Sequence, residues 1–377
     1  MEKVTFLVLH LNYGGIERQV TTLANSLVDE YEVEIVSIYD ILGKSFYPLD
    51  PRVKVKYILP YGPNQKELLQ ALKKVQIGKF FKELKKSIKL LYTRYFHIGK
   101  IVEEIDTNYL VSSRIEFSKQ FKRDDIVIIS QEHSYINTPS YKRKVTKSFS
   151  HVDYLIVMTK KAKEQYDLWL KECKKRPRVM YIPNMIEDPK EEVNIDLNSK
   201  QIISIGRLEE VKDFPALIEV FHLVQKEHPD WTLKIIGEGS QRKKLEKMIK
   251  ELGLNDKVIL TGRLSGEKIE EELNRSAIFA LTSVTESFSL GLVEAMAHYL
   301  PCVSYEIEVG PKEIISDQED GFLIKDRSKV EMAKKINELI EDHVQRVEIG
   351  NLARKKAEQF FASHIKTLWK GLFHKDN

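Results

Sequence analysis

The sequence has very few cysteines. Of its 377 residues only Cys173 and Cys302 are cysteines, and they lie far apart without paired ligand residues beside them. A disulfide framework and a cysteine zinc site are therefore not indicated. This scarcity fits a reducing compartment, and we expect a cytoplasmic protein.

Long apolar runs are missing as well. No run approaches the roughly 20 residues that a membrane-spanning helix needs. The N-terminus, MEKVTFLVLHLNYGG, has one lysine and a short apolar run but no small-residue cleavage site after it. We interpret this run as a buried strand that leads to a glycine turn, and not as a signal peptide.

Positive charge is concentrated in one stretch, although the net charge is only +4. From Lys66 to Lys100, ten Lys or Arg and two Glu give a local charge of +8. Apolar residues recur there at helical spacing, which predicts a cationic amphipathic helix. Two interpretations stay open: a solvated lysine face, or peripheral contact with anionic lipid or a phosphate-bearing acceptor. A nucleic-acid partner is not expected, because no recognised binding module accompanies the charge. The apolar residues are Ile77, Phe80, Phe81, Leu84, Ile88, Leu91 and Tyr95.

Short apolar runs alternate with longer helical patterns, and the chain is too long for a single core. We therefore expect an α/β protein with two Rossmann-like, doubly wound domains. The polar stretch from Glu187 to Lys200 suits a linker, so the domains are placed at 1–187 and 188–360. A final helix at about 361–377 is expected to pack back on the first domain. The predicted strands are 4–9, 33–39, 53–58, 109–113, 125–130, 154–159, 179–183, 201–206, 232–237, 258–262, 278–283, 302–306 and 322–324.

Two candidate ligand-binding segments follow predicted strands, where doubly wound sheets bind their ligands. Gly14 and Gly15 join the first strand to a helix and would let an anion approach the helix amides, although a purely structural turn explains them equally well. The turn lacks the G-x-G-x-x-G spacing of a dinucleotide site. Arg207 and Lys212 lie in the loop after 201–206, and two fixed cations there suit a diphosphate leaving group.

The strongest signal is the segment TSVTESFSLGLVEAM. A helix is expected to begin near Ser289 or Leu290, so the amides just before and at its start can bind an anion. Glu286 precedes the helix and Glu294 lies just over one turn inside it. Carboxylates accept hydrogen bonds from sugar hydroxyls, so this arrangement indicates a nucleotide-sugar site. The amides are those of Ser287, Phe288, Ser289 and Leu290.

Several motifs in this order resemble the family 4 retaining glycosyltransferases of the GT-B fold. They are Gly14-Gly15, GRLEEVKDF, IIGEG, LTGRL, ESFSLGLVEAM and VGPKEIISDQEDGFLI, and the resemblance covers nearly the whole chain. It implies two Rossmann-like domains that face a central cleft, with the donor between them. It also implies a retaining hexosyltransferase without metal or other cofactor, and no evident Asp-x-Asp motif contradicts this.

The resemblance also implies roles for individual residues. The Gly15 amide and the side chains of Arg207 and Lys212 would bind the diphosphate. Glu294 would bind the ribose hydroxyls, and Glu286 those of the transferred sugar. The main chain from Ser287 to Leu290 would contact donor phosphate or sugar, that of Leu264 would contact the base, and His133 would lie near the donor sugar.

Two departures from the family pattern stand out. Ser289 occupies a position where glycine is frequent, and Val309-Gly310-Pro311 replaces a commoner Gly-Gly pair. We take the second to concern which sugar is accepted. The expected function is transfer of a hexose or N-acetylhexosamine from a UDP-sugar to a glycan or lipid-linked acceptor in cell-surface polysaccharide synthesis. A nucleotide-sugar epimerase of GT-B architecture and a non-catalytic nucleotide-sugar-binding module are the alternatives.

Overall fold

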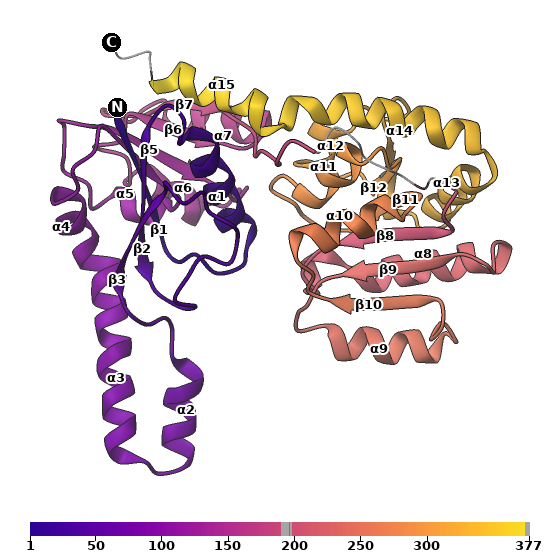
Figure 1. The fold of residues 1–377 in the computed structure, drawn as a ribbon, viewed down its shortest axis with the longest axis horizontal. Helices are drawn as coiled ribbons and strands as arrows, with labels where there is room; N and C mark the ends of the chain where they lie inside the picture. Colours follow the sequence, from indigo (N-terminus) through magenta and orange to yellow (C-terminus); the bar gives the residue numbers. More distant parts are fainter. Residues whose placement is uncertain (190–195, 197, 374–377) are drawn as a thin grey trace. The chain divides into compact units, whose positions relative to one another are not determined.

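The chain forms two compact units in a computed structural model that describes residues 1–189, 196 and 198–373 (Figure 1). Unit 1 comprises Met1–Pro183 and Lys366–Asn377, and unit 2 comprises Asn184–Ile365. The first boundary therefore follows Pro183, where the sequence suggested 187. The centre of the predicted linker, 190–195 and 197, and the end of the predicted final helix, 374–377, lie outside the described residues.

Unit 1 is built on a parallel sheet. In its described part seven strands pair in the order β3-β2-β1-β4-β5-β6-β7. Strand β1 is buried from Val4 to Val8, as expected for a parallel strand that is covered on both faces. The strands are β1 (Lys3–Val8), β2 (Glu32–Tyr39), β3 (Lys54–Leu59), β4 (Tyr109–Ser112), β5 (Val127–Glu132), β6 (Tyr154–Val157) and β7 (Arg178–Tyr181).

Unit 2 repeats this architecture with a shorter sheet. Its described strands pair in parallel in the order β10-β9-β8-β11-β12-β13. The doubly wound fold is therefore confirmed in both units. The strands are β8 (Gln201–Ile205), β9 (Thr232–Ile236), β10 (Val258–Gly262), β11 (Ile278–Leu281), β12 (Cys302–Tyr305) and β13 (Phe322–Ile324).

Helices connect successive strands, and their apolar faces complete a core on each sheet. In unit 2, for example, Leu217, Phe221 and Val224 of α8 are buried against the sheet. The helices of the two units, apart from those of the hairpin described next and the last helix, are α1 (Gly15–Leu27), α5 (Ile115–Ser118), α6 (Pro139–Val145), α7 (Lys160–Leu170), α8 (Phe214–Glu227), α9 (Arg242–Glu251), α10 (Gly266–Asn274), α11 (Leu290–Ala297), α12 (Pro311–Ile314), α13 (Lys329–Glu341) and α14 (His343–Ala357), with short 3₁₀ turns η2 (Glu210–Lys212), η3 (Lys325–Arg327) and η4 (Glu358–Phe360).

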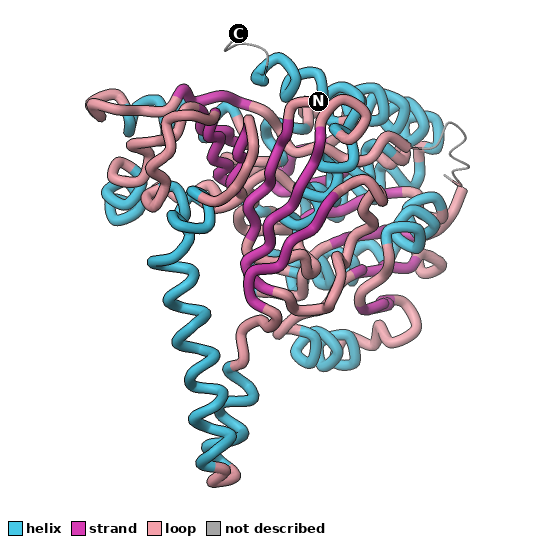
Figure 2. The backbone as a smooth tube through the Cα atoms, turned by 60° about the vertical axis from the view of Figure 1, so that its left-hand side comes forward, coloured by secondary structure: helices cyan, strands magenta, loops and turns pink. Residues whose placement is uncertain are grey.

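The basic stretch is a helical hairpin, which corrects the prediction of one helix over 66–100. Helix α2 (Gln65–Lys73) turns at Val75, whose φ is 54°, into α3 (Ile77–Tyr92), which continues through a π-helical turn η1 (Thr93–His97) into α4 (Ile98–Glu103). The hairpin extends away from the sheet of unit 1 (Figures 1 and 2). Most of the predicted apolar stripe is solvent-exposed: Ile77, Phe81, Ile88, Leu91 and Tyr95. Among the described residues no helix has the length and apolar character to cross a membrane.

The last helix, α15 (Ala362–Phe373), contributes its C-terminal part to unit 1. The ring of Phe373 packs against Tyr109, with centroids 4.6 Å apart, and the hydroxyl of Tyr109 donates to the carbonyl of Phe373 at 2.8 Å. Lys366 and Lys370 both pair with Glu30, and these pairs lower the pKa of that carboxyl to about 2. Residues at opposite ends of the chain thus form one packed unit.

Candidate functional site

The strand order of unit 2 locates its functional edge. Strands β8 and β11 are neighbours in the sheet. After β8 the chain continues to β9 on one side of this pair, and after β11 it continues to β12 on the other side. Ligands of doubly wound sheets bind beyond the carboxyl ends of the strands at this switch point. The loop after β8 carries Arg207 and Lys212, and the loop after β11 carries Glu286. The predicted cations and the predicted carboxylate therefore lie on adjacent loops.

Lys212 and Glu286 are in direct contact. The Lys212 ammonium pairs with Oε1 of Glu286, and only 17% and 10% of the two side chains is exposed. The hydroxyl of Ser283 donates to the same carboxylate oxygen at 2.7 Å. A cation and a carboxylate that are shielded from water interact more strongly than a surface pair. The sequence predicted both residues but not their pairing.

The two loops are also joined through the main chain. The amide of Val284 donates to the carbonyl of Val211 at 2.8 Å. The hydroxyl of Thr282 donates to the carbonyl of Asp213 at 3.0 Å. Asp213 has φ 45° and is the N-cap residue of α8, where its side chain accepts from the amide of Ala216. Lys212 is thus held between a strained cap and the neighbouring loop.

Helix α11 begins at Leu290, one of the two starts that the sequence predicted. Its N-cap residue Ser289 has φ 82°, a left-handed conformation that glycine adopts without steric cost. This explains why glycine suits the position. The Ser289 side chain makes no capping hydrogen bond, so it does not occupy the helix amides. Phe288 is buried against Phe360, and Glu294 is 6% exposed.

Gly310 packs against the loop after β11, which carries Glu286. A Cβ at this position would lie 3.0 Å from Cβ of Glu286 and 3.1 Å from the carbonyl of Phe288, and the residue has φ 90°. Only glycine meets both conditions without strain. The departure Val309-Gly310-Pro311 is therefore part of the wall beside Glu286.

The other predicted residues of unit 2 lie at the same edge of the sheet. Arg207 is solvent-exposed and lies two residues beyond the end of β8. Leu264 is partly buried and lies between β10 and α10. Two glycines of IIGEG bring the loops after β8 and β9 into close contact, because a Cβ on Gly237 or Gly239 would collide with the carbonyls of Gly206 and Leu208, respectively.

Unit 1 gathers polar side chains at its own switch point, between β1 and β4. Gly14 caps α1 and Gly15 begins it, and the carboxyl of Glu17 folds back over Gly14. Oε1 of Glu17 lies 3.3 Å from Nδ1 of His10, which follows β1. Burial raises the pKa of Glu17 and lowers that of His10. Sequence reasoning selected the glycines and missed Glu17, although it lies only two residues beyond Gly15.

His133 follows β5 at the same edge of unit 1. Desolvation, and secondarily the charge of Arg114, lowers its pKa to about 3, so the imidazole is neutral at physiological pH. The preceding Glu132 is buried and accepts hydrogen bonds from the hydroxyls of Tyr141 and Tyr166. Arg114, which follows β4, also belongs to this edge, and sequence reasoning missed it as it missed Glu17.

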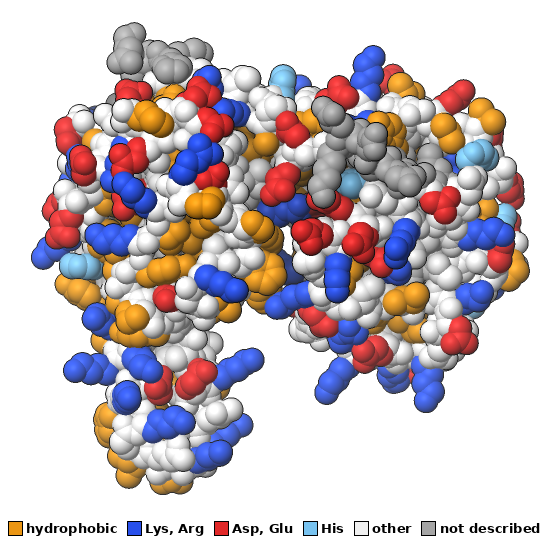
Figure 3. All heavy atoms as spheres, viewed as in Figure 1, with side chains coloured by type: hydrophobic (Ala, Val, Ile, Leu, Met, Phe, Trp, Pro, Cys, Tyr) orange, Lys and Arg blue, Asp and Glu red, His pale blue; other side chains and the backbone are white. Residues whose placement is uncertain are grey.

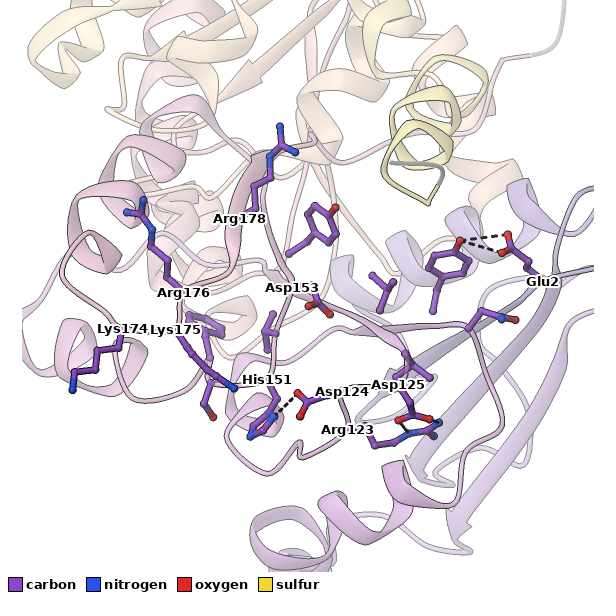
Figure 4. Close-up of a pocket in the computed structure, with 18 residues that line it drawn as sticks. Glu2, Arg123, Asp124, Asp125, His151, Asp153, Lys174, Lys175, Arg176 and Arg178 are labelled. Carbon is purple, nitrogen blue, oxygen red and sulfur yellow. Dashed lines mark hydrogen bonds and ion pairs between the residues drawn. The ribbon is translucent and has the colours of Figure 1, made fainter. Parts of the chain in front are cut away.

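A separate pocket of about 930 Å³ lies at the opposite edge of the unit 1 sheet, where β4, β5, β6 and β7 begin (Figure 4). Lys174, Lys175, Arg176 and Arg178 line one side, while the ring of His151 pairs with Asp124. None of the predicted site residues lines this pocket. We therefore do not assign the function to it.

One group of possible metal ligands occurs in the described part of the chain. Glu227, His228 and Glu341 bring their ligand atoms within 4.8 Å of one another. Glu227 ends α8, so the group lies at the amino edge of the unit 2 sheet, away from Lys212 and Glu286 in the fold. Two of its three members are exposed. It contributes nothing to the candidate site.

Comparison with known proteins identifies relatives among glycosyltransferases. Residues 185–356 match the family model of the glycosyl transferases group 1. An exopolysaccharide phosphotransferase of Streptomyces coelicolor is 29% identical over 98% of this chain, but the chain spans only 40% of that protein's length. A Campylobacter jejuni N-acetylgalactosaminyltransferase, named for a substrate linked to PP-undecaprenol, is 26% identical over 98% of this chain and 97% of its own.

The fold is similar to that of solved GT-B structures. A TarM variant of S. aureus, in complex with fondaparinux, alpha-GlcNAc-glycerol and UDP, aligns with a TM-score of 0.76. The alignment covers 100% of both chains at 17% identity. At this identity the likeness shows the fold alone, and it confirms the GT-B architecture that the motifs indicated.

Proposed function

The chain carries a glycosyl transferases group 1 domain in a GT-B fold, and on that premise we propose a specific reaction. It transfers a hexose or N-acetylhexosamine from a UDP-sugar, with retention of configuration, to a glycan or lipid-linked acceptor. The Lys212–Glu286 pair beside the start of α11 is the observation that carries the proposal.

Unit 2 supplies the groups that a nucleotide sugar needs. Lys212 and Arg207 bind the diphosphate, and the first amides of α11 add partial positive charge. Glu286 accepts hydrogen bonds from the sugar, and Glu294 accepts from the ribose. Donor binding exchanges the contact between Lys212 and Glu286 for contacts of each with the donor.

The reaction proceeds on one face of the sugar in our proposal. The bond between the anomeric carbon and the diphosphate oxygen breaks, and the acceptor oxygen bonds to the same face. The acceptor proton passes to an oxygen of the departing phosphate. Fixed cations stabilise the growing charge on the leaving group, so we assign this task to Lys212 and Arg207 and propose that no metal takes part.

The acceptor class is suggested by relatives and by the hairpin. The Campylobacter relative is named for a polyprenyl-diphosphate-linked substrate, and we propose a similar lipid-linked or polymeric acceptor in polysaccharide synthesis. The hairpin presents exposed Phe81, Ile88 and Leu91 together with lysines (Figure 3). This combination suits peripheral contact with the anionic cytoplasmic face of a membrane, where we place the protein.

A thermal-shift panel tests the donor. A ligand that binds only the native state stabilises it in proportion to the logarithm of its concentration over its Kd. We expect UDP-sugars to raise the melting temperature more than GDP- or ADP-sugars do. A panel without any stabilising nucleotide sugar contradicts the proposal. Isomerisation of the donor without transfer indicates an epimerase instead, and binding without turnover indicates a non-catalytic module.

A further inference from the structure

Arg327 joins the two loops that carry Lys212 and Glu286. It lies in η3, directly after β13, and its sequence context KDRSK reads as an ordinary polar loop. Its guanidinium donates from Nη1 to the carbonyl of Ser283 at 2.7 Å and from Nη2 to that of Thr282 at 2.8 Å. These carbonyls follow the end of β11, so Arg327 holds the start of the loop that carries Glu286.

The same guanidinium also contacts the loop after β8, which carries Lys212. Nη2 lies 2.6 Å from Oδ2 of Asp213, the residue next to Lys212. Arginine presents its donors in a rigid planar fork, so one side chain can fix several acceptors in a set geometry. Arg327 thereby links segments that follow β8, β11 and β13.

The guanidinium is itself held in place. It lies over the ring of Tyr305, with its central carbon 4.5 Å from the ring centroid, which is within the range of a cation–π contact. Arg327 has φ 51° and the preceding Asp326 has φ 53°. Side-chain-bearing residues rarely adopt this conformation, and it persists only where surrounding contacts enforce it. The strained turn therefore aims Arg327 at the two loops.

We infer that Arg327 is a positioning residue: its guanidinium sets the distance between the loop that bears Lys212 and the loop that bears Glu286. Arg327 acts through these loops and needs no contact with the donor. The inference rests on the proposed function, because it concerns the same donor site. It assigns to η3 a role that neither the sequence nor the comparisons indicated.

The test is a double-mutant cycle on nucleotide affinity. We would measure the Kd of UDP by calorimetry for the wild type, Arg327→Ala, Lys212→Ala and the double variant. Arg327→Ala should raise the Kd about tenfold, which corresponds to about 1.4 kcal/mol. If Arg327 acts through Lys212, the same substitution in the Lys212→Ala background should raise it less than about threefold.

Two further variants separate positioning from folding. Lys329→Ala removes a neighbouring cation that pairs with Glu219 on the surface, and it should leave the Kd within about twofold. Asp213→Asn keeps a good N-cap for α8 and removes only the charge opposite Arg327. It should raise the Kd, as Arg327→Ala does, but by a smaller factor. The melting temperature should stay nearly unchanged.

The outcomes are distinguishable. Equal Kd values for the wild type and Arg327→Ala overturn this inference and leave the proposed function standing. A full tenfold effect that persists in the Lys212→Ala background also overturns it, because Arg327 would then act independently of Lys212. If UDP, GDP and ADP all fail to bind the wild type, the proposed function fails, and the inference fails with it.

Discussion

The ammonium of Lys212 contacts the carboxylate of Glu286, although 73 residues separate them in the chain. The parallel order of β8 and β11 brings the loops that carry them together. Each residue therefore holds its partner's charge in position before a donor arrives. Donor binding then exchanges this mutual contact for contacts of each residue with the donor.

Removing one partner of this pair should destabilise the fold. The Glu286 side chain is only 10% exposed, and Lys212→Ala removes the cation that pairs with it. We therefore expect a loss of about 1 to 3 kcal/mol in the free energy of unfolding. Urea denaturation measures it. Lys312→Ala is the matched control, since its pair with Glu306 is 55% and 24% exposed and should contribute no more than about 1 kcal/mol. Equal losses would contradict the account.

Ser289→Gly should stabilise the protein. Ser289 has φ 82°, and relief of this conformation is worth about 1 kcal/mol, partly offset by the greater freedom of glycine in the unfolded chain. The free energy of unfolding in urea measures the change. Ser287→Gly is the control, because Ser287 does not have a positive φ, and it should destabilise. A loss of stability in Ser289→Gly would show that strain at this cap is not relieved by glycine.

His133 should make stability depend on pH below its ordinary pKa. Its pKa is about 3 in the folded protein and about 6.5 when unfolded. Between these values the unfolded chain binds a proton that the folded one does not, so stability falls as pH falls from 6.5 toward 3. The slope from this residue is about 1.4 kcal/mol per pH unit. His133→Gln should remove that slope in urea titrations between pH 4 and 6, and an unchanged slope would contradict the assignment.

The hairpin should bind anionic vesicles. Replacing Lys82, Lys85, Lys86 and Lys89 with Gln should reduce sedimentation with phosphatidylserine vesicles by about 100-fold or more at low salt, because each lysine near such a surface contributes about 1 kcal/mol. The matched control replaces four exposed lysines of α9: Lys243, Lys244, Lys247 and Lys250. Equal binding of both variants, or no dependence on salt, would leave the hairpin as a solvated surface.

Local patterns in the sequence were sufficient for the strands of the two sheets. Strands such as β1 and β5 are buried on both faces, so they read as continuous apolar runs bounded by turns. The start of α11 at Leu290 followed from small polar residues before an apolar helix. The hairpin was misread, because apolar residues at helical spacing normally mark a buried face, whereas Phe81 and Ile88 are 62% and 59% exposed.

Residues that act through tertiary contacts could not be found in the same way. Arg327 contacts Asp213, which lies 114 positions earlier in the sequence. The residues around Arg327 have the pattern of an ordinary polar loop. Glu17 was missed because its role depends on how its side chain folds over Gly14. Spacing shows which residues share a face of one element, but only the fold shows which loops meet.

The most direct test of the account is release of nucleoside diphosphate from a panel of nucleotide sugars, with and without candidate acceptors. We predict release by the wild type and by Lys312→Ala, and a loss of about 100-fold or more in kcat/KM for Glu286→Gln and for Lys212→Ala, the size expected when a group that stabilises transition-state charge is removed. Wild-type rates in both site variants, while they remain folded, would contradict the central claim that the Lys212–Glu286 pair forms the donor site.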